Sequence, residues 1–454
     1  MEKGGVSFWW RDIGLPGRRA PLSGDAQADV CIIGAGYTGL WTAHYLKKQR
    51  PDLDILIVER DFAGFGASGR NGGWLTGGFA WAHDRYATRG RDPVRQMVHA
   101  MMSTVDEVIS VAEAAGIDAD IRRTDELMVA INPAQEARMK AEAAHRASWG
   151  EAGRIHTIGA DDLARRIRIP GARGAMVVEG VARIHPAKLV AGLARLVEGQ
   201  GVRIAEGTTV LGYGPGRVDT DRGTIRATTV LRCTEGFTAS LKDHRRDWLP
   251  LNSAQIVTEP LPQGVWDEIG WDGHEILGDF ANAYCYCQRT REGRITVGAR
   301  GIPYRFGSQT DQNGMPDAET IRRLTTILHR HFPATRSLAI DHAWCGVLGV
   351  PRDWCATVGF DPHQRIGQAG GYVGVGVSTS NLAGRTLADL TLGRDNDLTR
   401  LPWVNRPLRR WEPEPLRWLG VRAMYGLYGL ADRQETQGGP PSPLARLGNW
   451  LTGR

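Results

Sequence analysis

Residues 28–39 constrain this chain most, because they join a short apolar strand to a turn with a strict glycine spacing. Val30 to Ile33 has strand character, and a helix is expected over residues 40–48. Between them stands the pattern G-x-G-x-x-G, formed by Gly34, Gly36 and Gly39. In such a turn the first glycine permits the tight bend, the second lets the backbone approach a pyrophosphate, and the third lets helix and strand pack closely. The helix start adds unpaired N–H groups that favour an anion.

An acidic residue completes this pattern. A second apolar strand over residues 54–58 ends in Glu59, twenty residues after Gly39. A carboxylate at that point can accept hydrogen bonds from a ribose diol. The order of strand, glycine turn, helix, strand and acid therefore predicts a dinucleotide-binding site. The alternative is a purely structural βαβ unit whose turn binds nothing.

Two further glycine-dense stretches follow the same logic. Residues 64–74 hold five glycines, which are incompatible with a regular helix or strand and let the backbone approach a flat or anionic group. Within this loop Arg70 offers a charge for phosphate, and Asn71 offers a neutral donor and acceptor. Residues 371–376 form another glycine turn ahead of a helix expected over 377–392. A second helix start would again direct N–H groups at a bound group.

Composition excludes several classes of protein. The net charge of +6 comes from basic residues scattered among nearly as many acids, so nucleic acid is not an expected partner. The six cysteines form no C-x-x-C pair, and we expect neither a metal nor disulfides. No window approaches about 18 uninterrupted apolar residues, so no transmembrane segment is expected. The apolar triplet Phe8-Trp9-Trp10 is followed at once by charges and does not resemble a signal peptide, which favours a cytoplasmic protein.

At 454 residues the chain exceeds one ordinary domain. Strands alternate with helices in the glycine-rich parts, whereas residues 252–310 look antiparallel. The expected fold class is therefore α/β, a Rossmann domain with an inserted α+β substrate domain built on an antiparallel sheet. The Rossmann domain is expected at 1–90, 173–240 and 341–395, the substrate domain at 91–172 and 241–340, and a basic, Trp-rich extension at 396–454. Leu416 to Leu430 is apolar with basic flanks and packs on its own chain, on another subunit or on a membrane surface.

The three glycine stretches, together with the segment His185-Pro186-Ala187-Lys188-Leu189, resemble the D-amino-acid-oxidase-like flavoprotein superfamily. Within it, the chain is most similar to the branch that contains gamma-glutamylputrescine oxidase, and the similarity covers roughly residues 25–395. The resemblance implies that the Rossmann domain is of the glutathione-reductase type and binds FAD. It implies much less about the substrate.

Carried over position by position, the resemblance implies a set of cofactor contacts. The residues expected to bind FAD are Gly34, Ala35, Gly36, Thr38, Gly39, Glu59, Arg60, Ser68, Arg70, Asn71, Gly72, Gly73, Val210, Thr234, Gly374, Gly376 and Val377. The N–H of Val377 would face the flavin N1/O2 edge, where reduction places negative charge that a helix start stabilises. We expect non-covalent FAD, because the glycine loop carries Arg70-Asn71 where some relatives carry a linking histidine. Cys345 stands near, but not on, the position of a linking cysteine.

One departure from the family bears on the substrate. Glycine-oxidase-like members hold the substrate carboxylate with an arginine shortly after a tryptophan on a strand, and Leu348 stands at the comparable position here. A leucine cannot pair with a carboxylate, and a buried unpaired carboxylate is costly. Arg300 is either an alternative anchor or a surface ion pair. The remaining candidates for the substrate pocket, each of which either walls the pocket or packs in the core, are Trp74, Tyr284, Tyr286 and Trp344.

The expected reaction is oxidation of a primary or secondary amine at its C–N bond, with hydride transfer to flavin N5, an imine product, and reoxidation by O2 or another acceptor. Such chemistry depends on position and a dry apolar wall more than on a strong protein base, so no catalytic residue is assigned. The alternatives are an NAD(P)H-reduced flavin monooxygenase or halogenase-like enzyme, an α-amino-acid oxidase or dehydrogenase, and a protein that keeps FAD structurally. The sequence leaves the oligomeric state open.

Overall fold

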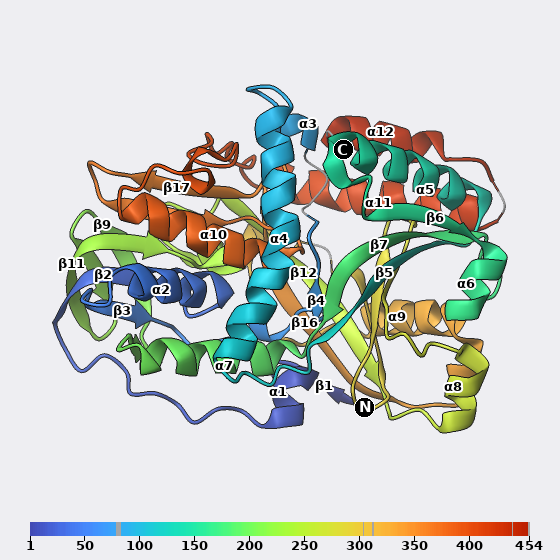
Figure 1. Cartoon of the computed structure of the whole chain (residues 1–454), viewed down its shortest axis with the longest axis horizontal. Helices are drawn as coiled ribbons and strands as arrows, with labels where there is room; N and C mark the ends of the chain where they lie inside the picture. Colours follow the sequence, from blue (N-terminus) through green and yellow to red (C-terminus); the bar gives the residue numbers. More distant parts are fainter. Residues whose placement is uncertain (79–82, 303, 311–312, 438, 453–454) are drawn as a thin grey trace.

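The structure, a computed structural model, describes residues 1–78, 83–302, 304–310, 313–437 and 439–452. In this part of the chain the strands form one sheet of eight strands and one of ten. Figure 1 shows the eight-stranded sheet with its helices on the left, the ten-stranded sheet on the right, and the long helix α4 (Asp92–Ala114) between them. The α/β fold class predicted from the sequence is confirmed.

The eight-stranded sheet contains the strands that flank the first glycine turn. Its order is β17-β18-β11-β2-β3-β8, and β10 and β9 continue antiparallel from β11. The five strands from β18 to β8 run parallel, and β17 is antiparallel. Both faces of the central strands are covered, which explains their continuous apolar runs. The bounds are β2 Ala26–Ile33, β3 Ile55–Val58, β8 Arg203–Ala205, β9 Val210–Gly214, β10 Arg217–Thr220, β11 Gly223–Arg232, β17 Thr357–Asp361 and β18 Ile366–Gly370.

Three helices lie against one face of this sheet in Figure 1: α2 (Tyr37–Gln49), α7 (Pro186–Gly199) and α10 (Gly376–Thr391). Helices α2 and α10 approach closely at Gly384, where an added Cβ would lie 2.7 Å from Trp41 Cβ. The apolar residues of α4 are buried in the same core, as Met97 and Val108 show. This core therefore ties the helices to both sheets.

The ten-stranded sheet runs in the order β1-β16-β12-β15-β14-β13-β5-β7-β4, with β6 beside β7. Its neighbours are antiparallel except for β1–β16 and β13–β5, so the antiparallel sheet predicted for the substrate domain is confirmed. The bounds are β1 Glu2–Lys3, β4 Trp74–Leu75, β5 Arg122–Ala130, β6 Ile155–Gly159, β7 Gly174–Arg183, β12 Trp248–Thr258, β13 Ile276–Asp279, β14 Cys285–Arg289, β15 Ile295–Ile302 and β16 Ile340–Pro351.

Short and medium helices border this second sheet. Leu324 and Leu328 of α9 lie in one apolar core with Ala254 of β12 and Val297 of β15. This core fills the sheet face that α9 covers. The helices are α1 Phe8–Ile13, α3 His83–Tyr86, α5 Pro133–Arg146, α6 Ala160–Arg166, α8 Gln263–Ile269 and α9 Ala318–His331.

Two strands belong to a different sheet from the one that the predicted domain ranges imply. β7 lies within the range 173–240 that was assigned to the Rossmann domain, yet it pairs antiparallel with β5 in the ten-stranded sheet. β16, which lies within 341–395 except for its first residue, pairs with β12 in the same sheet. For β7, the reason is that a strand followed closely by a helix has the same sequence pattern in either sheet, so that only the pairing partner decides. Helix α7 and strand β8 do return to the eight-stranded sheet.

The described residues of the extension over 396–454 pack on the chain itself. Trp403 and Trp411 are buried, and Trp411 Nε1 donates a hydrogen bond to the Val350 carbonyl at 2.7 Å. Two helices follow, α11 (Leu416–Thr436) and α12 (Pro443–Thr452), which lie side by side in Figure 1. No described helix is both long and apolar enough to cross a membrane.

Candidate functional site

An open cavity of about 1230 Å³ lies where β2, β3 and β11 end. This is the carboxyl edge of a parallel sheet, the usual position of ligands in open α/β folds. Of the residues predicted to bind the cofactor, those that line the cavity are Gly34, Gly36, Thr38, Glu59, Arg60, Ser68, Asn71, Val210, Thr234, Gly374, Gly376 and Val377. Ala35, Gly39, Arg70, Gly72 and Gly73 do not line it. The three glycine stretches thus meet at one cavity.

The first glycine turn has the geometry that its spacing requires. Gly34 has φ +103°, and a Cβ there would lie 2.7 Å from the Cys233 carbonyl oxygen. Gly36 caps α2 without a side-chain hydrogen bond, so the start of the helix stays open to the cavity. Gly39 faces β2 instead, where a Cβ would lie 2.1 Å from the Gly34 carbonyl oxygen. The turn therefore tolerates no side chain at Gly34 or Gly39 without a backbone shift.

Glu59 lies where a ribose-binding acid is expected. Its carboxylate accepts hydrogen bonds from the backbone N–H groups of Ala35 (2.9 Å) and Asp61 (3.0 Å). Burial raises the pKa of Glu59, and these two N–H donors oppose that rise. Ala35 thus contributes to the site indirectly, because its N–H orients the carboxylate that lines the cavity.

The second glycine stretch is held in shape by Asn71. Its side-chain NH2 donates to the carbonyls of Ala67 (3.3 Å) and Ser68 (2.9 Å), and its oxygen accepts the N–H of Gly73 (2.8 Å). The Ser68 hydroxyl accepts the N–H of Tyr37, the first residue of α2, at 2.8 Å. Loop and helix start are therefore joined directly at the cavity wall.

Arg70 is not among the described residues that line the cavity, although the resemblance implies that it contacts the cofactor. Its side chain is buried, its Nε donates to the Phe65 carbonyl at 2.7 Å, and one terminal nitrogen donates to the Cys345 carbonyl at 3.2 Å. The guanidinium also lies over the Phe65 ring, 4.3 Å from its centroid. The physical reason is that the loop needs an internal set of donors for its own carbonyls, because these are buried and cannot bind water. Arg70 is a positioning residue.

The N-terminal segment supports the same loop from behind. Ser7 Oγ donates to the Gly69 carbonyl (2.7 Å), Trp9 Nε1 to the Asn71 carbonyl (2.8 Å), and Trp10 Nε1 to the Gly64 carbonyl (3.3 Å). A Cβ on Gly69 would lie 2.1 Å from Trp10 Nε1, so contact is close. The tryptophan pair therefore holds the loop in place.

The third glycine turn places a second helix start at the cavity. Gly374 has φ +101°, and Val375 caps α10 without a side-chain hydrogen bond. The hydroxyl groups of Tyr372 and Thr38 lie 2.9 Å apart, so the starts of α10 and α2 are linked across the cavity. Two open helix starts that face one space favour a ligand with negative charge in its middle.

Sequence reasoning missed Glu235, which also lines the cavity. Its carboxylate accepts the N–H groups of Gly371 (3.0 Å) and Tyr372 (3.2 Å) and so fixes the third glycine turn. Burial raises the pKa of Glu235 to about 7 against these donors. The available signal was an acid shortly after the parallel strand β11, which ends at Arg232. Other lining residues that the sequence did not single out include Tyr37, Phe65, Thr208, Cys233, Phe237, Val347 and Tyr372.

The predicted substrate-pocket residues separate into two groups. Leu348 lines the cavity next to Gly374, 3.8 Å from the position of an added Cβ. Trp344 is fully buried and donates from Nε1 to the Arg70 carbonyl at 2.9 Å, so it is a core residue. The side chain of Arg300 lies outside the described part of the structure.

The aromatic residues on the strands lie behind the glycine loop. The Tyr286 hydroxyl is 2.8 Å from the Ser253 hydroxyl, and its ring lies 6.1 Å from the Trp74 ring in an edge-on arrangement. A Cβ on Gly72 would be 2.8 Å from the Tyr286 ring, and one on Gly73 would be 2.1 Å from Gln288 Nε2. Gly72 and Gly73 thus pack against β14 rather than face the cavity. Tyr284 is half-buried just before β14.

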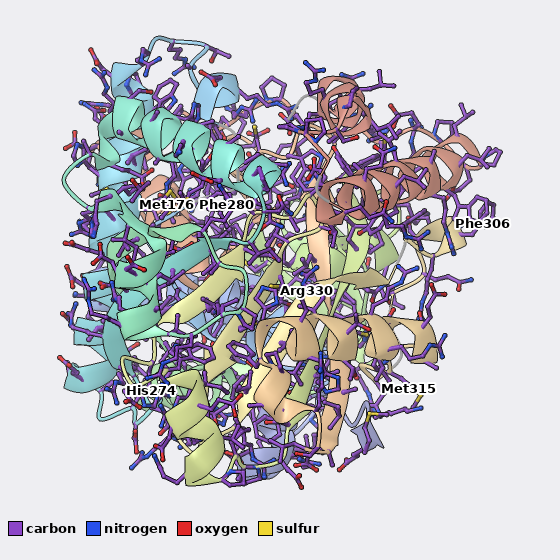
Figure 2. All side chains as sticks on the ribbon, turned by 90° about the vertical axis from the view of Figure 1, so that its right-hand side faces the viewer. Met176, His274, Phe280, Phe306, Met315 and Arg330 are labelled. Atoms are coloured by element: carbon purple, nitrogen blue, oxygen red, sulfur yellow. The ribbon has the colours of Figure 1, made fainter. Side chains whose placement is uncertain are left out.

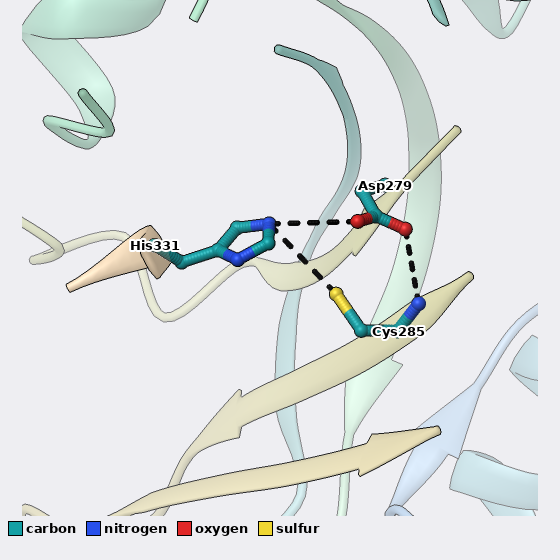
Figure 3. A group of neighbouring side chains, drawn as sticks. All are labelled: Asp279, Cys285 and His331. Atoms are coloured by element: carbon teal, nitrogen blue, oxygen red, sulfur yellow. Dashed lines mark hydrogen bonds and ion pairs between the residues drawn. The ribbon is translucent and has the colours of Figure 1, made fainter. Parts of the chain in front are cut away.

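A separate buried group contains Asp279, Cys285 and His331 (Figure 3). His331 Nε2 lies 3.7 Å from Asp279 Oδ2 and 3.8 Å from Cys285 Sγ, and His331 Nδ1 lies 3.0 Å from the Ile327 carbonyl oxygen. These spacings would suit a metal ion, but the Arg330 guanidinium already supplies a cation to Asp279 Oδ2 at 3.4 Å. The group is a polar network that fixes the end of α9 to β14.

Comparison with known proteins agrees with this geometry. A family model described as DAO, FAD dependent oxidoreductase, matches residues 29–390. The chain is 27% identical over 419 residues to the probable oxidoreductase OrdL of Rhizobium meliloti (strain 1021), covering 88% of this chain and 92% of that protein. It is 27% identical over 426 residues to the gamma-glutamylputrescine oxidoreductase of Escherichia coli (strain K12), covering 91% and 94%. The solved structure of glycine oxidase from Geobacillus kaustophilus matches with a TM-score of 0.70 at 20% identity, covering 84% of this chain and 100% of that one.

Proposed function

Because this chain belongs to the DAO family of FAD-dependent oxidoreductases, we propose that it oxidises a primary or secondary amine at its C–N bond. The similarity to a gamma-glutamylputrescine oxidoreductase supports an amine, and the glycine oxidase match supports the shared fold. When bound, FAD would supply a two-electron acceptor for this oxidation, in which the carbon loses a hydride and the nitrogen a proton to give an imine, and O2 or another acceptor would reoxidise the cofactor.

The choice of an amine depends on one observation, the chemistry at the Leu348 end of the cavity. Leu348 and Val347 are apolar and lie beside the third glycine turn. Among the described residues that line the cavity, the only basic side chain is that of Arg60, which follows Glu59 at the end of β3. A substrate carboxylate placed beside Leu348 would have no cation there to replace its hydration.

The chain's own residues bind and orient. Glu59 offers a carboxylate to a ribose, and the N–H groups at the starts of α2 and α10 face the anionic part of the cofactor. The start of α10 at Gly376 and Val377 stabilises negative charge that develops on the flavin during reduction. Leu348 and Val347 exclude water from the region where an uncharged amine would lie.

We further propose that FAD is held without a covalent bond. No histidine is among the described residues that line the cavity, and Cys233 is the one cysteine there. Burial raises the pKa of Cys233 to about 12, so its thiol is a poor nucleophile. Cys345 lies in the core behind α9, away from the cavity. The six cysteines are all free thiols, which supports our proposal of a cytoplasmic location.

Anaerobic titration of the yellow holoenzyme tests this function. The panel contains simple amines, polyamines, acylated polyamines and α-amino acids, and the readout is bleaching of the flavin absorbance. We expect amines to reduce the flavin and α-amino acids to fail. Leu348→Met keeps volume and polarity and is the matched control for Leu348→Arg, which is expected to gain reduction by carboxylated substrates.

Other outcomes of the same titration would assign other functions. Reduction by α-amino acids alone would contradict the argument from Leu348 and favour a carboxylate anchor such as Arg300. Rapid bleaching by NAD(P)H without any amine would favour a monooxygenase or halogenase-like enzyme. A flavin that no member of the panel reduces would indicate a structural cofactor.

A further inference from the structure

Helix α11 presents an apolar stripe to solvent. Leu419, Ala423 and Leu430 lie 3, 7 and 14 positions after Leu416. This spacing places the four residues on one side of a helix with 3.6 residues per turn. All four are exposed, with relative exposures of 62% for Leu416, 52% for Leu419 and 53% for Leu430. The opposite side of the helix, which carries Val421 and Tyr428, is buried. The stripe is therefore not part of the contact that holds α11 on the protein.

Exposed apolar side chains are concentrated on this part of the surface. Leu447 of α12 is 48% exposed, and Phe306 is 54% exposed and lies edge-on to the Trp418 ring, 6.3 Å between centroids. Figure 2 views this face and places Phe306 at its rim beside α11. Half of the large exposed apolar residues of the described chain thus lie on or against α11 and α12. Such a concentration marks an interaction surface.

The charges around the stripe are of one sign. The acids of this region point inward: Glu414 accepts the Gly307 N–H, Asp432 accepts the Asn282 and Ala283 N–H groups, and Glu435 pairs with Arg138. In contrast, Arg422 and Arg433 are exposed beside the stripe. Neither forms an ion pair with a described acid, and Arg422 lies over the Trp418 ring. The outward charge is therefore positive.

A groove between α9 and α11 continues this basic surface. The cavity has a volume of about 1750 Å³, and Arg323 and Arg330 of α9 line it opposite Arg422 and Arg433 of α11, together with Asp432 and Glu435. Arg323 pairs with Glu319 and Arg330 with Asp279. Ile327 and Leu430 add apolar wall between these charges. Figure 2 shows Arg330 between the two helices. The guanidinium groups of Arg422 and Arg433, which pair with no described acid, remain available for phosphate oxygens, which they bind through paired hydrogen bonds.

We propose that α11 docks the enzyme on the surface of an anionic phospholipid bilayer. An amphipathic helix with leucines on its outer face and arginines at the border lies in the plane of the membrane interface, with its charges at the headgroups. The groove would take headgroup phosphates next to the inserted stripe. A second copy of this chain is a poorer occupant, because two such faces in contact would bring unpaired arginines together. This inference is independent of the amine proposed above.

Vesicle co-sedimentation of the full-length holoenzyme tests the proposal. We expect binding to vesicles of phosphatidylcholine mixed with phosphatidylglycerol, and little binding to phosphatidylcholine alone. Each basic residue near an anionic surface contributes about fivefold to the partition constant, so Arg422→Gln with Arg433→Gln is expected to lower it about 25-fold. Leu416→Ser, Leu419→Ser and Leu430→Ser combined are expected to lower it at least about tenfold. Higher salt should weaken binding.

The matched control is Leu15→Ser with Leu211→Ser, two leucines of similar exposure (60% and 58%) far from α11 in sequence. This variant should bind vesicles as the parent does, and flavin content verifies folding in every variant. If the triple variant loses flavin, the single change Leu430→Ser takes its place. Equal binding to both kinds of vesicle, or equal loss in the control, would overturn the proposal. A dimer seen by light scattering that the leucine changes convert to monomer would assign the stripe to a second copy.

Discussion

Replacing Arg70 by methionine tests whether this residue positions the glycine loop or contacts the cofactor. The guanidinium donates to the carbonyls of Phe65 (2.7 Å) and Cys345 (3.2 Å), and each charge-assisted bond of this kind contributes about 1.5–3 kcal/mol. Loss of both leaves two buried carbonyls unpaired, while removal of a buried charge recovers part of its desolvation cost. We expect the free energy of unfolding to fall by about 3 kcal/mol. Arg70→Lys keeps the charge but not the planar set of donors, so it should recover less than half of this loss.

The assay is urea denaturation of the apoprotein, followed by tryptophan fluorescence, because cofactor binding would otherwise add its own stabilisation. A positioning role predicts a lower apoprotein midpoint for Arg70→Met. A direct contact with the FAD phosphates predicts something else: an unchanged apoprotein midpoint together with weaker FAD binding in a fluorescence titration. That second pattern would refute our description of Arg70.

Three further predictions concern the cavity. Gly34→Ala should abolish flavin retention, because alanine at φ +103° is strained and its Cβ would lie 2.7 Å from the Cys233 carbonyl oxygen. The measurement is flavin absorbance after gel filtration, and the control is Gly17→Ala, because Gly17 has open space around it. Leu348→Arg should allow α-amino acids to reduce the flavin, which we expect them not to do in the parent enzyme, and no gain would contradict the placement of Leu348 beside the substrate. Burial raises the pKa of Glu235 to about 7, above its ordinary value. The contribution of this group to the free energy of unfolding is therefore fully present below about pH 4.5, and it is lost as the pH rises to about 7. Glu235→Gln should flatten this dependence of the denaturation midpoint between pH 5 and pH 8, and a persisting slope would mean that another group titrates.

The part of the site that sequence predicted best depends on backbone geometry. Gly34 and Gly374 are required by positive φ, a constraint that acts within a few residues and is therefore visible as a pattern. The direction of the Arg70 side chain could not be predicted, because it depends on Cys345, which is remote in the chain. Glu235 was missed for the same reason, since its partners lie at Gly371 and Tyr372.

The fold followed the same division between local and distant information. Helix α4 depends on local information, because the helical spacing of its apolar residues is a property of the segment itself. The sheet to which β7 belongs depends on its pairing with β5 about fifty residues earlier, and the strand sequence alone does not encode that choice. The sequence likewise does not decide whether Trp344 lines the substrate pocket or packs in the core, because this depends on its hydrogen bond to the carbonyl of Arg70, a residue far away in the chain.

The support that Ser7, Trp9 and Trp10 give to residues 64–71 has a consequence for biosynthesis. These residues precede the loop in the chain and have no partners until the loop has been made, and the opposite wall, with Tyr372 and the start of α10, is synthesised much later than the loop. The nascent chain can therefore bind the cofactor only after both walls of the cavity have been synthesised. A polypeptide released before residue 372 should remain colourless, however much of its larger sheet has already formed.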